Sequence, residues 1–388
     1  MKTGIAFADL LANVKNTHES KRDYSLDTRA LSLKTDKDGS ILTIDGLPES
    51  EIITNFNLSD RAHSQIRERL GIPADYYKKL RGSAHLHGLL DHNVNQLFNL
   101  EPENRLVRTL DGGVRAFLSD RYQVIDNYDI LATCLPELTE LADRHGAVVE
   151  SADITEAKMY IKIKLPGIQY DLGQIKSGPY QGLMDVLHPM IYLTNSEVGS
   201  GAVRIQPGIF RLVCENGLMC DEAALTQYHV SRSIQTNKGG RVKNGHHFDG
   251  AKVQADVTSL LSDEAKEADD KAFLLKIRDV MRAAVTSMQF EKLVDTFGAT
   301  QGLPIKAPKI AIEVLSNRAS LTNDDGERIF EALLAGGDLS LYGLINAVTF
   351  AAQDTKDYDK ATELEELGGK LLANTNEIQR EILSASAR

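Results

Sequence analysis

The chain has 388 residues, 42% hydrophobic and 26% charged, with 10 prolines; this composition excludes an intrinsically disordered chain, which would have too few apolar residues to form a core. No apolar run reaches the roughly 18–20 residues that a membrane-spanning helix needs, and Asp9 stands where a signal peptide would be apolar, so we expect a cytoplasmic protein with no membrane partner. The three cysteines are too few for a disulfide framework, so we expect them to be reduced and mostly buried, and the formal charge of −11 excludes a protein that coats nucleic acid with its whole surface.

The N-terminal part of the chain alternates predicted hairpins and helices. The Asp38-Gly39 step is a hairpin turn signal between two β-type runs. Ser59 is typical of a helix N-cap, and Gly71 is typical of a helix end. In chain order the sequence predicts a hairpin over 29–36 and 40–46, a helix over 59–71, a hairpin over 104–110 and 114–125, and a helix over 129–145.

The middle of the chain is rich in predicted strands. Residues 157–167 alternate apolar side chains with Lys158, Lys162 and Lys164, which predicts a strand with one buried and one cationic face. Two more strands are predicted within 189–214, and Gly217 is expected to end this run.

The C-terminal part reads as helical after a basic loop. Residues 235–252 are polar, basic and rich in glycine, without apolar periodicity, which predicts a loop. The apolar periodicity of residues 253–296 predicts a nearly continuous helix with a break near Ser262, and shorter helices are predicted after it. Residues 251–388 hold 16 Lys and Arg against 23 Asp and Glu, so most of the net negative charge of the chain lies in this part.

These patterns predict an α+β protein whose N-terminal and central antiparallel hairpins and sheet pack with helices, followed by a helical C-terminal part. We expect a core domain over 1–234, a basic glycine-rich loop over 235–255, and a helical region over 256–388 that packs on the core.

Common catalytic motifs are absent. The sequence contains neither GxxxxGK[ST] nor GxGxxG, and it contains no HExxH, GxSxG or zinc-deaminase signature. We therefore expect a binding protein rather than an enzyme, with no catalytic residues, no cofactor and no metal. One alternative is a metal-dependent nuclease that uses His85, His87 and Asp91; the other interpretation of these residues is that they are polar turn residues.

Several basic elements combine positive charge with aromatic rings or glycines, which favours contact with nucleic acid. Each also has a structural interpretation: a solvated helix face with half-buried tyrosines, a linker with chance charge, or a polar cluster that fixes a turn. The candidate nucleic-acid-binding residues are Arg67, Tyr76, Tyr77, Lys78, Lys79 and Arg81 near the first helix, Lys158, Lys162, Arg204 and Arg211 on the central strands, and Lys238, Arg241 and Lys243 in the basic loop.

Four stretches carry a resemblance to a known family. They are the segments 117–122 (FLSDRY), 194–204 (TNSEVGSGAVR), 210–218 (FRLVCENGL) and 341–349 (LYGLINAVT). On these residues the chain resembles a protein family of phages, prophages and plasmids that is known as domain of unknown function 932 (DUF932). The resemblance implies a setting of mobile-element DNA maintenance, recombination or interference with host defence, and it implies no catalytic residues. The order of hairpins and helix is also similar to that of phage single-strand annealing proteins, which assemble into rings or filaments.

The sequence thus predicts a phage- or plasmid-like protein that binds single-stranded DNA in a basic groove and assists annealing or recombination without nucleotide hydrolysis, as a homo-oligomer. The alternative is an acidic protein that binds a phage or host protein through its C-terminal helices, as an inhibitor of host defence would, and that does not bind DNA.

Overall fold

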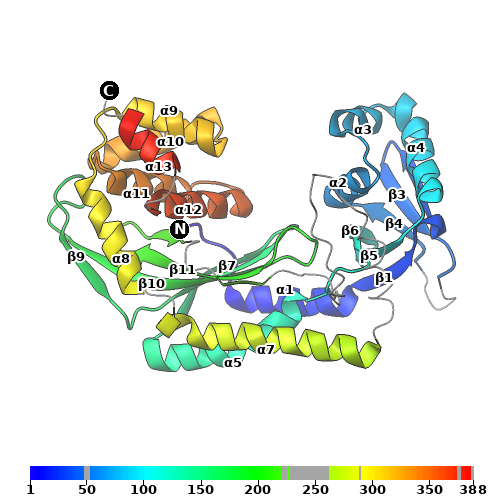
Figure 1. The fold of residues 1–388 in the computed structure, drawn as a ribbon, viewed down its shortest axis with the longest axis horizontal. Coiled ribbons are helices and arrows are strands. Elements are labelled where there is room, and N and C mark those ends of the chain that lie inside the picture. Colours follow the sequence, from blue (N-terminus) through cyan, green and yellow to red (C-terminus); the bar gives the residue numbers. More distant parts are fainter. Residues whose placement is uncertain (48–52, 221–224, 228–261, 288–289, 374–376, 386–388) are drawn as a thin grey trace, which may run out of the picture.

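The computed structural model describes residues 1–47, 53–220, 225–227, 262–287, 290–373 and 377–385. The protein has the predicted α+β fold, with two sheets and a helical C-terminal region (Figure 1). The two sheets belong to separate lobes, an N-terminal lobe and a central lobe, which are joined at the bottom of the molecule in this view. Among the described residues, every helix is too short or too polar to cross a membrane.

The N-terminal lobe consists of a six-stranded sheet covered on one face by three helices. Both predicted hairpins belong to this sheet, and its strand order is β1-β5-β6-β4-β3-β2. Leu42, Phe56 and Val107 from the strands pack with Ile66 and Leu90 from the helices. The elements of the lobe are β1 (Arg22–Asp27), β2 (Leu31–Asp36), β3 (Gly39–Ile44), β4 (Asn55–Leu58), α2 (Asp60–Arg69), α3 (Ala74–Arg81), α4 (His87–Leu100), β5 (Asn104–Leu110) and β6 (Gly113–Ser119).

The central lobe is built on a seven-stranded sheet with the main strand order β12-β11-β10-β8-β7; β9 pairs with β10, and β13 pairs with β11. All its strand pairs are antiparallel. The strands are β7 (Val148–Ile154), β8 (Met159–Lys164), β9 (Tyr170–Gln174), β10 (Met184–Asn195), β11 (Val203–Arg211), β12 (Asn216–Met219) and β13 (Leu225–Gln227).

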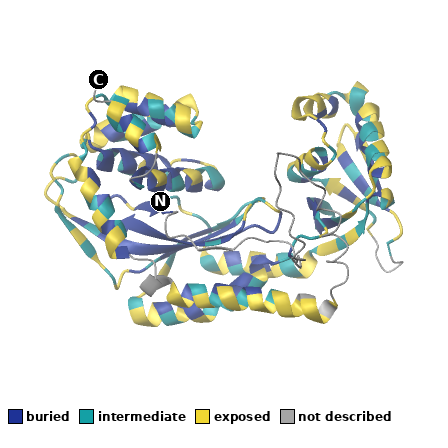
Figure 2. Ribbon diagram, in the orientation of Figure 1, coloured by how far each residue is buried: buried dark blue, intermediate teal, exposed yellow. Residues whose placement is uncertain are grey.

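Helices cover both faces of this sheet, so most residues of its central strands are buried (Figure 2). One face packs against α1 (Phe7–Ser20), α5 (Asn127–His145) and α7 (Asp263–Ser287). On the other face the sheet packs against α8 (Phe290–Ala299), α11 (Leu341–Ala351) and α12 (Tyr358–Leu372). The helices α9 (Pro308–Ala319), α10 (Asn323–Gly336) and α13 (Glu377–Ala385) form a further layer on these helices. The three cysteines are free and buried, as predicted.

The prediction that β8 has an exposed cationic face is wrong. The alternation itself is present, because Ile161 and Ile163 face the core formed with α1 and α5. The opposite face, however, is covered by α12, and Lys162 is only 1% exposed. Its Nζ donates a hydrogen bond of 2.7 Å to Oε2 of Glu365 on α12 and lies 4.7 Å from the ring centroid of Tyr358. The period of two in the sequence shows that a strand has two different faces, but it does not show what covers the second one.

Gly217 does not end the central strands, because it lies inside β12. Tyr192 of β10 lies across Gly208 of β11 and Gly217 of β12, and a Cβ on Gly217 would stand 2.6 Å from the Tyr192 hydroxyl oxygen. Glycine is therefore used here for the close approach of an aromatic ring and not for a turn.

Candidate functional site

The predicted patch near the first helices is partly exposed. Lys78 and Lys79 are exposed on α3, and Tyr76 is 42% exposed. Arg67 pairs with Glu68 at 2.8 Å, and Arg81 pairs with Asp60 at 2.6 Å. The contact with Asp60 brings the basic end of α3 to the first turn of α2.

Tyr77 does not present a stacking face. It is only 4% exposed, and its hydroxyl group lies 2.8 Å from Nδ1 of His63, which is also buried. Burial raises the pKa of Tyr77 to about 12 and lowers the pKa of His63 to about 4. Tyr77 is thus a core residue that anchors α3 to α2, and we leave it out of the candidate interface.

The buried imidazole of His63 predicts a pH dependence of stability. Its folded pKa of about 4 lies below the unfolded value of 6.5, so below pH 6.5 the unfolded state binds a proton that the folded state does not. Stability is therefore expected to fall as the pH drops from 6.5 towards 4, by about 3 kcal/mol from this group. Urea unfolding of the wild type and of His63→Gln at pH 7 and pH 4.5 measures this; an equal loss in both proteins would contradict the assignment.

The candidate residues on the central strands lie apart. Lys162 is buried against Glu365, and Arg204 faces Glu366 at 3.6 Å. Arg211 forms two hydrogen bonds with Asp185, of 2.7 and 3.0 Å. Only Lys158 reaches an open cleft. Lys238, Arg241 and Lys243 lie outside the described residues.

The histidines of the nuclease alternative do not form a metal site. Nε2 of His87 lies 3.0 Å from the carbonyl oxygen of Arg81, and Oδ2 of Asp91 accepts a hydrogen bond of 2.9 Å from the backbone N–H of Thr35. Within the described parts of the chain, no group of three His, Cys, Asp or Glu residues is placed to hold a metal ion.

A large cleft lies between the two lobes. Its main cavity has a volume of about 730 Å³, and a second cavity of about 310 Å³ adjoins it, since both are lined by Arg61, Ala157 and Lys158. Beside apolar side chains such as Leu58, Val114 and Ile154, the walls of the main cavity carry many amides and hydroxyls. They come from α1, the end of β4, the start of α5 and the β7–β8 turn, and include Asn13, Asn16, Thr17, Ser20, Asn57, Ser59, Asn127 and Thr155.

Two cations face this cleft from opposite walls. Arg61 belongs to the first turn of α2, in the N-terminal lobe, and Lys158 comes just before β8, in the central lobe. Among the described residues, neither has an ion-pair partner. The N-terminus of α2 lies at the same wall, where the Ser59 hydroxyl caps the helix by accepting from the N–H of Ala62 at 3.1 Å. Two cations without an ion pair in the described structure and a helix N-terminus favour an anion here. However, Asp111, Glu156 and Glu197 line the main cavity and Asp359, Glu363 and Glu366 line the smaller one, so the cleft as a whole carries no excess of positive charge.

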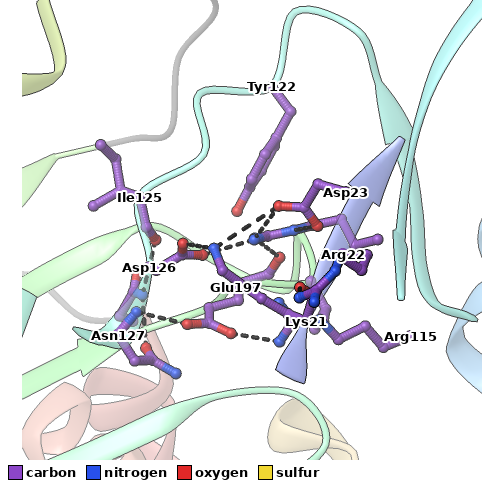
Figure 3. Close-up of polar contacts among 12 residues, drawn as sticks. Lys21, Arg22, Asp23, Arg115, Tyr122, Ile125, Asp126, Asn127 and Glu197 are labelled. Atoms are coloured by element: carbon purple, nitrogen blue, oxygen red, sulfur yellow. Dashed lines mark hydrogen bonds and ion pairs between the residues drawn. The ribbon is translucent and has the colours of Figure 1, made fainter. Parts of the chain in front are cut away.

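The base of the cleft rests on a buried ionic network at the points where the chain crosses between the lobes (Figure 3). Its centre is Arg108 of β5, whose side chain is fully buried. Arg108 donates to Asp23 of β1, to Oδ1 of Asp126 at 2.6 Å, and to the carbonyl oxygen of Glu197 at 2.8 Å. Lys21 also contacts Asp126, and both burial and the neighbouring Arg108 lower the pKa of Lys21. The network therefore ties both interlobe connections to the turn after β10.

Glu197 links this network to the cleft. Its Oε1 accepts a hydrogen bond of 2.6 Å from the backbone N–H of Asn127 at the start of α5, and its Oε2 accepts one of 2.5 Å from Arg115. The neighbouring Ser196 carbonyl accepts a hydrogen bond from Tyr122 at 2.8 Å, and burial raises the pKa of that tyrosine. The two segments 117–122 and 194–204, recognised separately in the sequence, thus meet at the base of the cleft.

The other two recognised segments meet at a separate cavity of about 270 Å³, between β9, α10 and α11. Here Arg211 and the hydroxyl of Tyr342 both donate to Asp185. Burial alone would lower the pKa of Arg211, but its hydrogen bonds to Asp185 raise it. Arg211 is therefore neutralised by a buried carboxylate and serves the polar cluster of this cavity, so we leave it out of the candidate interface.

The candidate binding residues chosen from the sequence do not include Arg61, Arg108 or Arg115, although Arg61 belongs to the basic run 61–81 that was considered for nucleic-acid contact. Arg61 stands in a run of charges that looks like an ordinary solvated helix face, and Arg108 and Arg115 sit in a predicted hairpin. The one signal for this region was the recognised turn that contains Glu197.

Residues 115–360 match the family described as domain of unknown function (DUF932). The match spans more than half of the chain, so the protein belongs to this family. No curated protein and no solved structure matches the chain.

Proposed function

We propose that the protein binds a single-stranded DNA segment in the interlobe cleft and assists strand annealing or recombination without nucleotide hydrolysis. The observation that carries this proposal is the pair Arg61 and Lys158, two cations that line the cleft from different lobes and have no ion-pair partner among the described residues. A backbone phosphate between them would give both cations a counter-charge, in competition with the carboxylates that line the same two cavities.

The rest of the cleft suits a backbone ligand. Amides and hydroxyls such as Asn13, Asn16 and Ser59 are groups that commonly bond to phosphate and sugar oxygens, which favours binding with little sequence preference. Lys78 and Tyr76 are exposed on α3 but do not line the cleft, and the Tyr76 hydroxyl faces Asn93 of α4, so the proposal does not depend on them. The formal charge of −11 is compatible with this, because the proposal needs only a local basic surface.

We expect the double substitution Arg61→Glu and Lys158→Glu to weaken binding of a labelled single-stranded oligonucleotide at least tenfold at low salt. It should also reduce the slope of log K against log salt by about 1.4, since each lost phosphate contact on a single strand is worth about 0.7. Fluorescence anisotropy with single-stranded and duplex oligonucleotides over a salt series measures both quantities.

Lys37→Glu with Lys271→Glu is the matched control, because it makes the same change in net charge at exposed positions that do not line the cleft. An equal loss in this control would show a general charge effect, and the assignment to the cleft would be wrong. Absence of binding to either form by the wild type at low salt would overturn the proposed function.

A second candidate function is the binding of a basic protein partner. It is favoured by the acidic wall of the smaller cavity, where Asp359, Glu363 and Glu366 of α12 stand opposite Arg61 and Lys158. If the wild type binds no oligonucleotide, this candidate is tested by capture of phage or host proteins on the immobilised protein. The double variant Glu363→Lys with Glu366→Lys is compared with the wild type. An unchanged set of captured proteins would contradict this candidate.

A further inference from the structure

Arg115 occupies an irregular position at the base of the interlobe cleft. On β5 the neighbours Arg108 and Thr109 pair with Ala116 and Val114 of β6, so Arg115 is the extra residue of a β-bulge. Bulges redirect a side chain and recur beside binding and active sites. Here the bulge turns Arg115 towards the cleft, which it lines together with Ser59 and Asn127.

The guanidinium group of Arg115 is only partly satisfied. Its Nη1 donates to Oε2 of Glu197 at 2.5 Å, but Nε and Nη2 are both buried and have no acceptor among the described residues. Buried polar groups are almost always hydrogen-bonded, and a charged donor without an acceptor is strongly unfavourable. Both nitrogens are closed to solvent, so a ligand in the cleft would supply the missing acceptor only if the Arg115 side chain turns further towards it.

The chemistry around Arg115 indicates which acceptor fits. The cleft is lined by three cations, Arg61, Arg115 and Lys158, and by three carboxylates, Asp111, Glu156 and Glu197, so the preference for an anion rests on the donors of Arg115 that are unpaired in the described structure and not on the net charge of the lining. A guanidinium group binds a phosphate through two parallel hydrogen bonds, and Nε and Nη2 are two neighbouring donors of that fork. Glu197 competes for the same arginine, because its carboxylate already neutralises part of the charge.

We propose that Arg115 anchors a phosphate-binding subsite at the base of the interlobe cleft. The phosphate group comes either from a nucleic-acid backbone, in which case the subsite rests on the proposed function, or from a free phosphate. In both cases Arg115 supplies the fork, Arg61 and Lys158 supply the remaining charge, and Glu197 limits the affinity.

The test is a titration with inorganic phosphate at constant ionic strength, with binding followed by the rise in melting temperature and by ³¹P line broadening. We expect saturable binding to the wild type, at least fivefold weaker binding to Arg115→Lys, and unchanged binding to the control Arg144→Lys, an exposed arginine on α5. Lysine keeps the charge but not the fork, so a purely electrostatic surface would bind phosphate equally in all three proteins and would overturn the proposal.

Glu197→Gln is the second variant, and it keeps the test decisive if Arg115→Lys does not fold. Glutamine can still accept from Asn127 but no longer neutralises Arg115, so phosphate should bind several-fold more tightly. Unchanged or weaker binding to Glu197→Gln would contradict the subsite even if Arg115→Lys were unfolded.

Competition with a labelled oligonucleotide distinguishes the two sources of phosphate. If phosphate displaces the strand from the wild type, and Arg115→Lys loses strand affinity, the ligand is the backbone. If no oligonucleotide binds but phosphate still binds through Arg115, the subsite stands and the proposed function fails. If the strand binds through Arg61 and Lys158 while phosphate binding is independent of Arg115, the proposed function stands and the subsite fails.

Discussion

Lys162→Met is expected to destabilise the protein by about 3–5 kcal/mol at pH 7, because it leaves the carboxylate of Glu365 buried without its cation. Both side chains are at most 1% exposed, and Oε1 of Glu365 already has no hydrogen-bond partner among the described residues. The rings of Tyr192 and Tyr358 next to Lys162 cannot compensate a carboxylate, and the N-terminal ammonium of Met1, which also interacts with Glu365, would offset only part of the loss. Urea unfolding followed by circular dichroism measures the loss.

The double variant Lys162→Met with Glu365→Leu should recover most of this loss, since a buried ion pair can often be replaced by apolar side chains at little cost. Lys15→Met is the matched control: Lys15 faces Glu19 with both side chains more than half exposed, and its removal should hardly change the unfolding midpoint. A loss from Lys162→Met no greater than in this control would mean that the pair is solvated and α12 is not packed on β8 as described.

Arg108→Met is expected to cost a similar amount, about 3–5 kcal/mol, because the buried carboxylate of Asp126, the partly exposed carboxylate of Asp23 and a carbonyl oxygen lose their shared donor. Arg108 is fully buried and bonds to residues from three segments: β1, the start of α5 and the turn after β10. The chain passes between the two lobes just before β1 and just before α5. Backbone amide hydrogen exchange should therefore increase at these two connections as well as in β5. Urea unfolding and hydrogen exchange measure the two effects.

Arg29→Met is the control for this variant. Arg29 forms the same two-bonded contact with Asp27, at 2.9 and 2.8 Å, but its side chain is 62% exposed, so its loss should leave the unfolding midpoint nearly unchanged. Equal effects of the two substitutions would contradict a structural role for burial of Arg108. A loss of stability without faster exchange at the crossings would show that the network stabilises one lobe and does not join the two.

The two variants also bear on the cleft. Lys162 lies under the wall that carries Lys158, and Arg108 lies beside the turn that holds Glu197 against Arg115. The strand-binding and phosphate-binding experiments therefore avoid both residues, so that a loss of affinity in those tests reports on the cleft surface and not on the stability beneath it.

The local structure could be predicted from the sequence alone. Turn residues such as Asp38-Gly39 and capping residues such as Ser59 act within a few residues of the chain, so the hairpins and the helix α2 were correctly predicted. The α+β class followed from the same local patterns, and the four recognised segments were sufficient to indicate the family to which the chain belongs.

Which charged side chains are exposed and which are buried in ion pairs depends on the tertiary structure. Lys158 and Lys162 stand on the same side of one strand in the sequence pattern, yet one lines a cleft and the other is buried under Glu365, which is 203 positions away in the chain. Arg211 and Tyr77 also lie in buried clusters. Arg61, in contrast, lies in an ordinary run of charged residues but lines the open wall of the interlobe cleft. The reason is physical: the pattern of a strand or helix records that a face is polar, but whether that face meets solvent, a carboxylate or a cleft depends on segments that are distant in sequence and meet only when the lobes assemble.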